Sequence, residues 1–208
     1  PNYRRAFIPG GCWFFTVNLL DRRETLLVDE IDLLRDAVIA TRRNHAFAID
    51  AFVVLPDHLH AVLSLPDGDP DFSTRWRLIK NRFARALPKH EPLNAVRRNR
   101  NERGIWQRRF WEHLIRDETD YARHVEYCYI NPFKHGLVPR VRDWPYSSFT
   151  ETYALESFRS IGQAMQNAAV ISASDMIQAR AVVADYASLI RPTIYFRPGI
   201  CVAFNEWS

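Results

Sequence analysis

The sequence predicts an α+β fold: a ferredoxin-like split βαβ arrangement, in which helices pack on an antiparallel sheet of four or five strands. Two observations support this prediction. Apolar segments with strand character alternate with amphipathic segments in the order β-α-β-β-α-β, and one more helix follows. In addition, 208 residues, 47% hydrophobic and 25% charged, are enough for one globular domain with an appendage.

The first half of the chain supplies three strands and one helix. Residues 12–20 (CWFFTVNLL) are apolar and rich in strand formers, and residues 29–44 have helical periodicity. Residues 46–56 read as a second strand that ends at Pro56-Asp57, and residues 58–65 return as a third. The short connection between them predicts an antiparallel hairpin.

The second half continues the pattern with a helix, a strand and another helix. Residues 66–70 (PDGDP) interrupt regular structure, and residues 73–89 are predicted to form a helix. The polar stretch 90–104 is predicted to be an exposed loop. Residues 105–115 are predicted to form the fourth strand. Residues 116–131 follow as a helix that we expect to end at Pro132.

We expect residues 1–150 to form one domain and residues 151–208 to form an extension, of unassigned role, packed on that domain. Cys12, Cys128 and Cys201 are far apart and form no CxxC motif, which favours reduced thiols over a disulfide framework or a zinc knuckle. We interpret Cys128 as a small buried residue. The sequence lacks an apolar run near the roughly 20 residues that cross a bilayer. We therefore expect a cytoplasmic protein with no membrane partner.

Positive charge is concentrated in one segment. The whole chain has a net charge of +4, but residues 72–142 carry 17 basic and 7 acidic side chains. A solvated surface would explain such an excess. However, most of these cations are arginines and aromatic residues lie among them, which favours a phosphate-binding face.

The His58-Leu59-His60 triplet begins the predicted third strand. Side chains alternate along a strand, so both histidines point to one face while Leu59 points into the core. Two neutral imidazoles on one rigid surface can hold a divalent cation. Taken alone, a His-x-His triplet is also compatible with chance.

Tyr127 and Asn131 lie four residues apart on the last predicted helix and therefore share a face. A phenol can attack a phosphodiester, and a carboxamide oxygen can complete a metal site begun by two imidazoles. Taken alone, the pair is also compatible with a core aromatic and a helix-end residue. Tyr129 is the competing nucleophile, but it would face away from Asn131.

These motifs occur together in a recognisable order. LPDHLHAVL, a basic helix, WQRRFWEHLIRDETDYARHVEYCYINPFKHGLV and DWPYSSF resemble the REP-associated tyrosine transposases, which are IS200/IS605-like members of the HUH endonuclease superfamily. The opening YRRAFIPGGCWFFTVNLLDRR is also similar to that family, and the resemblance covers about residues 2–150. The chain departs from it by continuing for nearly sixty residues after DWPYSSF.

The resemblance implies metal-dependent cleavage and rejoining of single-stranded DNA at REP-like palindromic hairpins with a 5′ tetranucleotide. Tyr127 would be the nucleophile, and His58, His60 and Asn131 would bind Mg²⁺ or Mn²⁺. Within residues 1–150, which would be the catalytic domain, the expected DNA contacts are Arg4, Arg5, Arg75, Trp76, Lys80, Arg82, Arg85, Arg97, Arg98, Arg100, Arg103 and Arg108. Trp106 and Trp111 are further candidates for stacking on bases. The protein would act as a monomer or a homodimer.

Other interpretations remain open at this point. The chain could be a Rep- or relaxase-like HUH nickase with another DNA target, a non-cleaving nucleic-acid-binding regulator, or an unrelated metal hydrolase. Asp57 could orient His58 or simply form a turn. We interpret His113 and His124 as surface or capping histidines, and His135 as covering the helix C-terminus.

Overall fold

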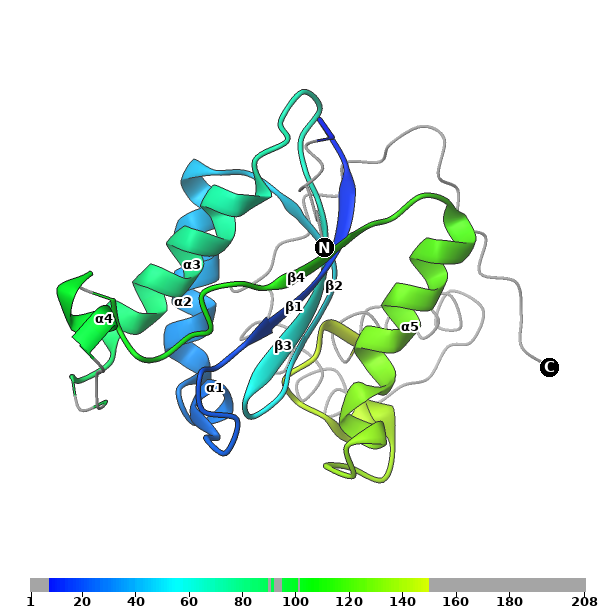
Figure 1. Cartoon of the computed structure of the whole chain (residues 1–208). Helices are drawn as coiled ribbons and strands as arrows, with labels where there is room; N and C mark the ends of the chain where they lie inside the picture. The colour runs from blue at the N-terminus through cyan, green and yellow to red at the C-terminus, as the bar shows by residue number, and fades with distance from the viewer. Residues whose placement is uncertain (1–7, 90, 92–94, 101, 150–208) are drawn as a thin grey trace, which may run out of the picture.

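In the described part of the chain, four strands form one antiparallel sheet, in the order β2-β3-β1-β4 (Figure 1). The strands are β1 (Cys12–Asn18), β2 (Ala48–Val54), β3 (His58–Ser64) and β4 (Trp111–Leu114). This order confirms the predicted split βαβ arrangement, because β3 lies between β1 and β2 while β4 pairs with the free edge of β1. The computed structural model describes residues 8–89, 91, 95–100 and 102–149.

Helices cover both faces of the sheet (Figure 1). On one face, Trp13, Phe15 and Val17 of β1 belong to the core that the sheet forms with α2 (Ile31–Asn44) and α3 (Phe72–Ala86). The opposite face of β1 presents Phe14, which belongs to a second core that includes Cys128 of α5 (Glu118–Lys134). Cys128 is fully buried, as the sequence predicts.

The regular elements differ from the predicted ones mainly at their ends. The first helical segment consists of the short α1 (Leu26–Asp29) and then α2. The predicted strand 105–115 is shorter, because only Trp111–Leu114 pair with β1, although Trp106 forms an isolated bridge to Leu19. No helix in the described part of the chain is both long and apolar enough to cross a membrane.

The prediction that residues 90–104 are an exposed loop is wrong in part. This segment contains α4 (Ala95–Asn99), and Arg97 is buried. The reason is that its arginines bond to the protein: Arg97 donates to the carbonyl of Arg103, and Arg103 donates to the carbonyls of Leu87 and Pro88 and pairs with Glu91. These bonds tie the segment to the end of α3.

The prediction that Pro132 ends the last helix is also wrong, because α5 continues to Lys134. Proline cannot donate a hydrogen bond to the carbonyl of Cys128, four residues earlier. The turn survives because later amides are bonded: that of His135 donates to Asn131 at 2.9 Å, and that of Leu137 donates to Pro132 at 2.9 Å. Asp117 caps the other end by accepting from the amide of Asp120.

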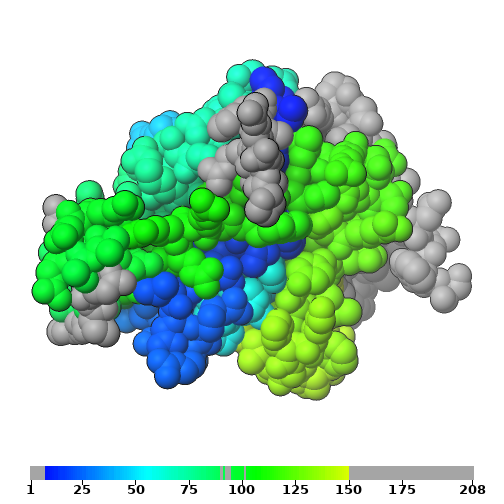
Figure 2. Space-filling view, in the orientation of Figure 1, coloured from blue at the N-terminus to red at the C-terminus, as the bar shows by residue number. Residues whose placement is uncertain are grey.

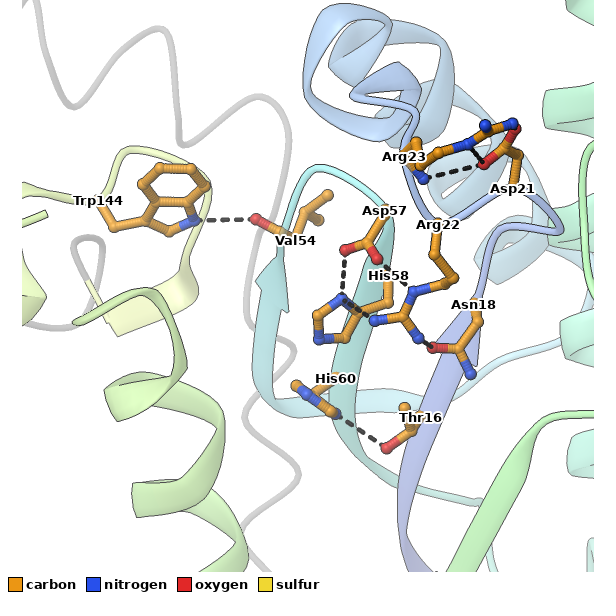
Figure 3. Close-up of polar contacts among 10 residues, drawn as sticks. All are labelled: Thr16, Asn18, Asp21, Arg22, Arg23, Val54, Asp57, His58, His60 and Trp144. Carbon is orange, nitrogen blue, oxygen red and sulfur yellow. Dashed lines mark hydrogen bonds and ion pairs between the residues drawn. The ribbon is translucent and has the colours of Figure 1, made fainter. Parts of the chain in front are cut away.

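The chain that follows α5 covers the free edge of β2. After the 3-10 turn η1 (Val141–Asp143), the indole Nε1 of Trp144 donates to the carbonyl of Val54 at 2.9 Å (Figure 3). The amide of Val54 donates to Tyr146, and the amide of Phe52 donates to the Ser148 hydroxyl. An otherwise open strand edge is thereby occupied. The predicted extension, 151–208, lies outside the described residues.

Candidate active site

Strand β3 places His58 and His60 on the sheet face that carries α5. Both side chains are buried, and their ring centroids lie 4.9 Å apart. Leu59 points to the opposite face and belongs to the core against α2 and α3. The period-two alternation of a strand produces this arrangement, as the sequence predicts.

His58 is oriented by a carboxylate and a guanidinium. Its Nδ1 lies 2.6 Å from Oδ1 of Asp57, and Asp57 also pairs with Arg22 (Figure 3). Arg22 in turn donates to the side-chain oxygen of Asn18 on β1. Nη2 of Arg22 also lies 3.3 Å from this Nδ1, but the shorter contact with the carboxylate favours a proton on Nδ1, which leaves the lone pair on Nε2 for another partner. Of the two roles considered for Asp57, the contact supports orientation of His58.

His60 is held by its cross-strand neighbour. Thr16 lies opposite His60 in the β1–β3 register, and its hydroxyl is 2.9 Å from Nδ1 of His60 (Figure 3). Burial lowers the pKa of His60 to about 3; repulsion from His58 and His135 adds to this, while the neighbouring Asn131 carboxamide opposes it. Burial also lowers the pKa of His58, against the opposing effect of Asp57. Both rings are therefore neutral near pH 7, which is the form that binds metal ions.

Helix α5 brings Tyr127 and Asn131 to the same place. The Tyr127 ring is 39% exposed, and its centroid lies 5.2 Å from that of His60. Lys134 Nζ lies 5.3 Å from the centroid of the Tyr127 ring, a geometry that favours a cation–π contact. The positions i and i+4 thus share a helix face, and that face is turned toward β3.

Asn131 has an unusual environment for a buried amide. The side chain is fully buried, and its Nδ2 donates to the backbone carbonyl of Tyr127, but its Oδ1 has no hydrogen-bond partner among the described residues. An unpaired buried acceptor costs roughly 1–3 kcal/mol. A hard divalent cation would satisfy it, and with two neutral imidazoles beside it the donor set fits such an ion.

Tyr129 lies on a different face of α5. Its hydroxyl is 3.3 Å from that of Ser148, and its ring packs against Phe149 with centroids 5.2 Å apart. It also packs against the second core, with Phe14 and Cys128. The geometry therefore brings Tyr127, and not Tyr129, to the histidine pair.

A third imidazole joins this group. The ring of His135 lies 5.5 Å from that of His58, which our interpretation of His135 as a helix-end residue did not include. Its spacing of four residues after Asn131 is the signal that could have revealed it. Arg22, Thr16 and Lys134 were also missed. Thr16 lies in the predicted strand 12–20, but the sequence does not show that it pairs with His60 on the neighbouring strand.

The structure separates the expected DNA contacts into buried and accessible groups. Arg75 and Trp76 are buried, which does not fit a DNA contact: Arg75 donates to the carbonyls of Ala46 and Asp71 and pairs with Asp69, and Trp76 belongs to the core. Four more of the candidate side chains bond to or pack within the protein itself. Lys80 donates to the carbonyls of Gln107 and Arg108. Arg97 and Arg103 hold α4 in place, and Trp106 is buried in the core. Burial lowers the pKa of Lys80 to about 8.

Among the expected DNA contacts that the structure describes, the accessible ones lie at one end of the molecule. Arg82 and Arg85 on α3 and Arg98 and Arg100 at α4 are exposed, as is Arg108, which pairs with Glu102. Figure 2 shows α4 (green) at the end of the molecule away from α5 (yellow-green), with the segment leading into β4 between them. Arg4 and Arg5 lie outside the described residues.

Comparison with known proteins gives a consistent result. No protein-family model matches the chain. A REP-associated tyrosine transposase of Escherichia coli K12 is 50% identical over 147 residues, which cover 71% of this chain and 81% of the relative. A relative in Haemophilus influenzae is 48% identical over 149 residues, covering 71% of this chain and 85% of the relative.

A solved structure, described as a REP-associated tyrosine transposase bound to a REP hairpin, has the same fold. It superposes with a TM-score of 0.65 at 49% identity, covering 74% of this chain and 86% of that one. Identity near 50% over four-fifths of a curated relative is decisive, and the chain therefore belongs to the family of REP-associated tyrosine transposases.

Proposed function

We propose that this protein cleaves and rejoins single-stranded DNA at REP-like hairpins, with Tyr127 as nucleophile. The observation that carries the proposal is the position of the Tyr127 ring, which lies 5.2 Å from His60 and one helical turn from the unpaired Oδ1 of Asn131. A partly exposed phenol beside a set of metal-ligand atoms is suited to attack a bound phosphodiester.

His58, His60 and Asn131 would hold Mg²⁺ or Mn²⁺, the ion that their neutral nitrogens and unpaired oxygen suit. When bound, the ion would polarise the scissile phosphate. Asp57 and Thr16 act through the histidines, since each fixes the Nδ1 side of one ring and leaves its Nε2 for the ion.

The chemical step exchanges one phosphodiester for another. Oη of Tyr127 forms a bond to phosphorus and loses its proton, while the bond from phosphorus to the 3′ oxygen breaks and that oxygen gains a proton. The product is a 5′-phosphotyrosine linkage and a free 3′-hydroxyl. Because the energy of the broken linkage is retained, attack by a 3′-hydroxyl reverses the step and rejoins DNA. No nucleotide cofactor is required.

Exposed aromatic and basic side chains would bind the DNA. Trp111 on β4 is 54% exposed, and both it and Tyr127 contact Phe14, with ring centroids 5.6 and 5.8 Å from that of Phe14. It is therefore placed to stack on an unpaired base next to the cleaved phosphate. Arg82, Arg85, Arg98 and Arg100 would contact the hairpin backbone, and Arg4 and Arg5 the 5′ tetranucleotide.

A denaturing gel tests this proposal. The protein is incubated with Mn²⁺ and a labelled hairpin oligonucleotide that carries its 5′ tetranucleotide, and with a nick-site oligonucleotide of the same length. We expect a covalent adduct on the hairpin that is lost in Tyr127→Phe and kept in Tyr129→Phe. Faster adduct formation on the nick-site DNA would indicate a Rep- or relaxase-like nickase. Tight binding of the hairpin without any adduct would indicate a non-cleaving regulator.

A further inference from the structure

A second group of ligand-type side chains lies on α5 and β4. Nε2 of His113, on β4, is 2.8 Å from Oδ2 of Asp120, and Nδ1 of His124 is 3.1 Å from Oδ1 of the same carboxylate. One ligand atom from each of the three residues lies within 4.8 Å of the other two. Sequence reasoning treated both histidines as isolated, because their contact depends on how α5 packs against β4.

This group is separate from the site around His60. The ring of Phe14 lies 4.8 Å from that of His124 and 5.5 Å from that of His60, so that Phe14 contacts both imidazoles. The His113 and His124 rings stack with centroids 4.5 Å apart and planes at 19°. Their side chains are 24% and 20% exposed, so an ion from solvent can reach them.

We propose that His113, Asp120 and His124 form a second metal site, one that selects Zn²⁺ or a similar borderline cation over Mg²⁺. Two imidazole nitrogens and one carboxylate oxygen are a common zinc donor set, with a water in the fourth position. Mg²⁺ prefers oxygen ligands, and this group supplies only one. The site around His60 has the same count of nitrogen and oxygen ligands, but there the phosphate oxygens of bound DNA would complete the shell of Mg²⁺.

The neighbouring structure prepares the ligands. The amide of Arg116 donates to Oδ2 of Asp120 at 3.1 Å, which fixes the carboxylate at the start of α5. Trp111 stacks on His113 with ring planes 6° apart, which restrains that ring. Nδ1 of His124 also lies 2.7 Å from the backbone carbonyl of Asp120, and a bound metal would displace the proton shared there as well as the one between His113 and Asp120. Each imidazole would bind as a neutral ring with its proton on the other nitrogen.

Metal binding at this place would cross-link two elements. His113 comes from β4 and the other two ligands from the first half of α5, the helix that carries Tyr127 three residues after His124 (Figure 1). A bound ion would therefore fix the start of α5 against the sheet. This role does not depend on DNA cleavage, so the inference can fail or hold independently of the function proposed for Tyr127.

The test uses the full chain with His58→Ala and His60→Ala, which removes the histidine ligands of the first site. Zn²⁺ is added in a calorimetric titration, Co²⁺ gives an independent signal through its visible absorption, and melting is followed with and without Zn²⁺. We expect one equivalent of Zn²⁺ to bind and the melting temperature to rise by several degrees. Millimolar Mg²⁺ should not compete.

Adding His124→Gln or Asp120→Asn to this background should weaken Zn²⁺ binding at least tenfold and abolish the melting shift. A matched control is His45→Gln, which removes a histidine after α2 and should change neither. Absence of stoichiometric Zn²⁺ binding in the His58→Ala, His60→Ala protein would overturn the proposal. Unchanged binding in both ligand variants would also overturn it. Either result would leave the three residues as a hydrogen-bonded contact only.

Discussion

Asp57 offers a sharp test of how the histidine pair is prepared for metal. In Asp57→Asn, the carboxylate that lies 2.6 Å from Nδ1 of His58 is replaced by a neutral carboxamide of the same shape. Its NH₂ group can donate to Nδ1, which places the ring proton on Nε2, the atom that should bind the ion. The substitution therefore reverses the preferred tautomer without removing a ligand.

The expected loss follows from the contact. A hydrogen bond to a charged group contributes about 1.5–3 kcal/mol, and every 1.4 kcal/mol is tenfold in affinity. We therefore expect Mn²⁺ to bind roughly 10- to 100-fold more weakly, which is also the usual effect of removing a partner of a metal-ligating histidine. Stability should change by less than about 1 kcal/mol, because the carboxamide still bonds to Nδ1 of His58 and the Arg22 partner is half exposed.

Mn²⁺ binding is measured from the loss of the free-ion electron paramagnetic resonance signal. The matched control is Asp21→Asn, which removes a carboxylate that pairs with the exposed Arg23, two residues away (Figure 3). The control should bind Mn²⁺ as the unmodified protein does. If Asp57→Asn also binds within twofold of the unmodified protein while folded, the assigned role of Asp57 is refuted.

Three further predictions concern the framework of the site. Arg75→Met should lower the free energy of unfolding by about 3 kcal/mol in urea titration, because it leaves Asp69 and the Ala46 carbonyl without their donor. The control Arg82→Met should change it by less than about 0.5 kcal/mol. Equal effects of the two substitutions would show that Arg75 is not structural. Trp144→Phe keeps an aromatic side chain but removes the indole N–H that bonds to Val54, and should cost about 1–3 kcal/mol. A neutral result would contradict the closure of the β2 edge. The pKa of His60 falls from 6.5 in the unfolded chain to about 3 in the folded protein. Between these pH values the unfolded state binds a proton that the folded state does not. The free energy of unfolding should therefore decline below pH 6.5 by up to about 1.4 kcal/mol per pH unit. His60→Gln should flatten that slope, and an unchanged slope would show that His60 is not the group responsible.

The candidate site could be predicted because its spacing rules are local. His58 and His60 share a face through the two-residue period of a strand, and Tyr127 and Asn131 share one through the four-residue spacing of a helix. The meeting of the two faces depends on α5 packing on β3, which the sequence indicated only through family resemblance.

The parts that could not be predicted depend on tertiary contacts. Arg75 looked like a phosphate ligand because arginine usually lies on surfaces, but in the fold it bonds to the carbonyl of Ala46, 29 residues away. Arg22 reaches Asp57 across 35 residues, and His113 meets His124 only after β4 and α5 have packed together. No period within a single element encodes such distances.

Peptide mapping of the trapped adduct by mass spectrometry shows directly whether Tyr127 carries the covalent bond to DNA. The protein is reacted with Mn²⁺ and the hairpin oligonucleotide, digested with nuclease and protease, and the nucleotide-bearing residue is located by fragmentation. We expect a 5′-linked nucleotide on Tyr127. A nucleotide on Tyr129, or on any other residue, would contradict it.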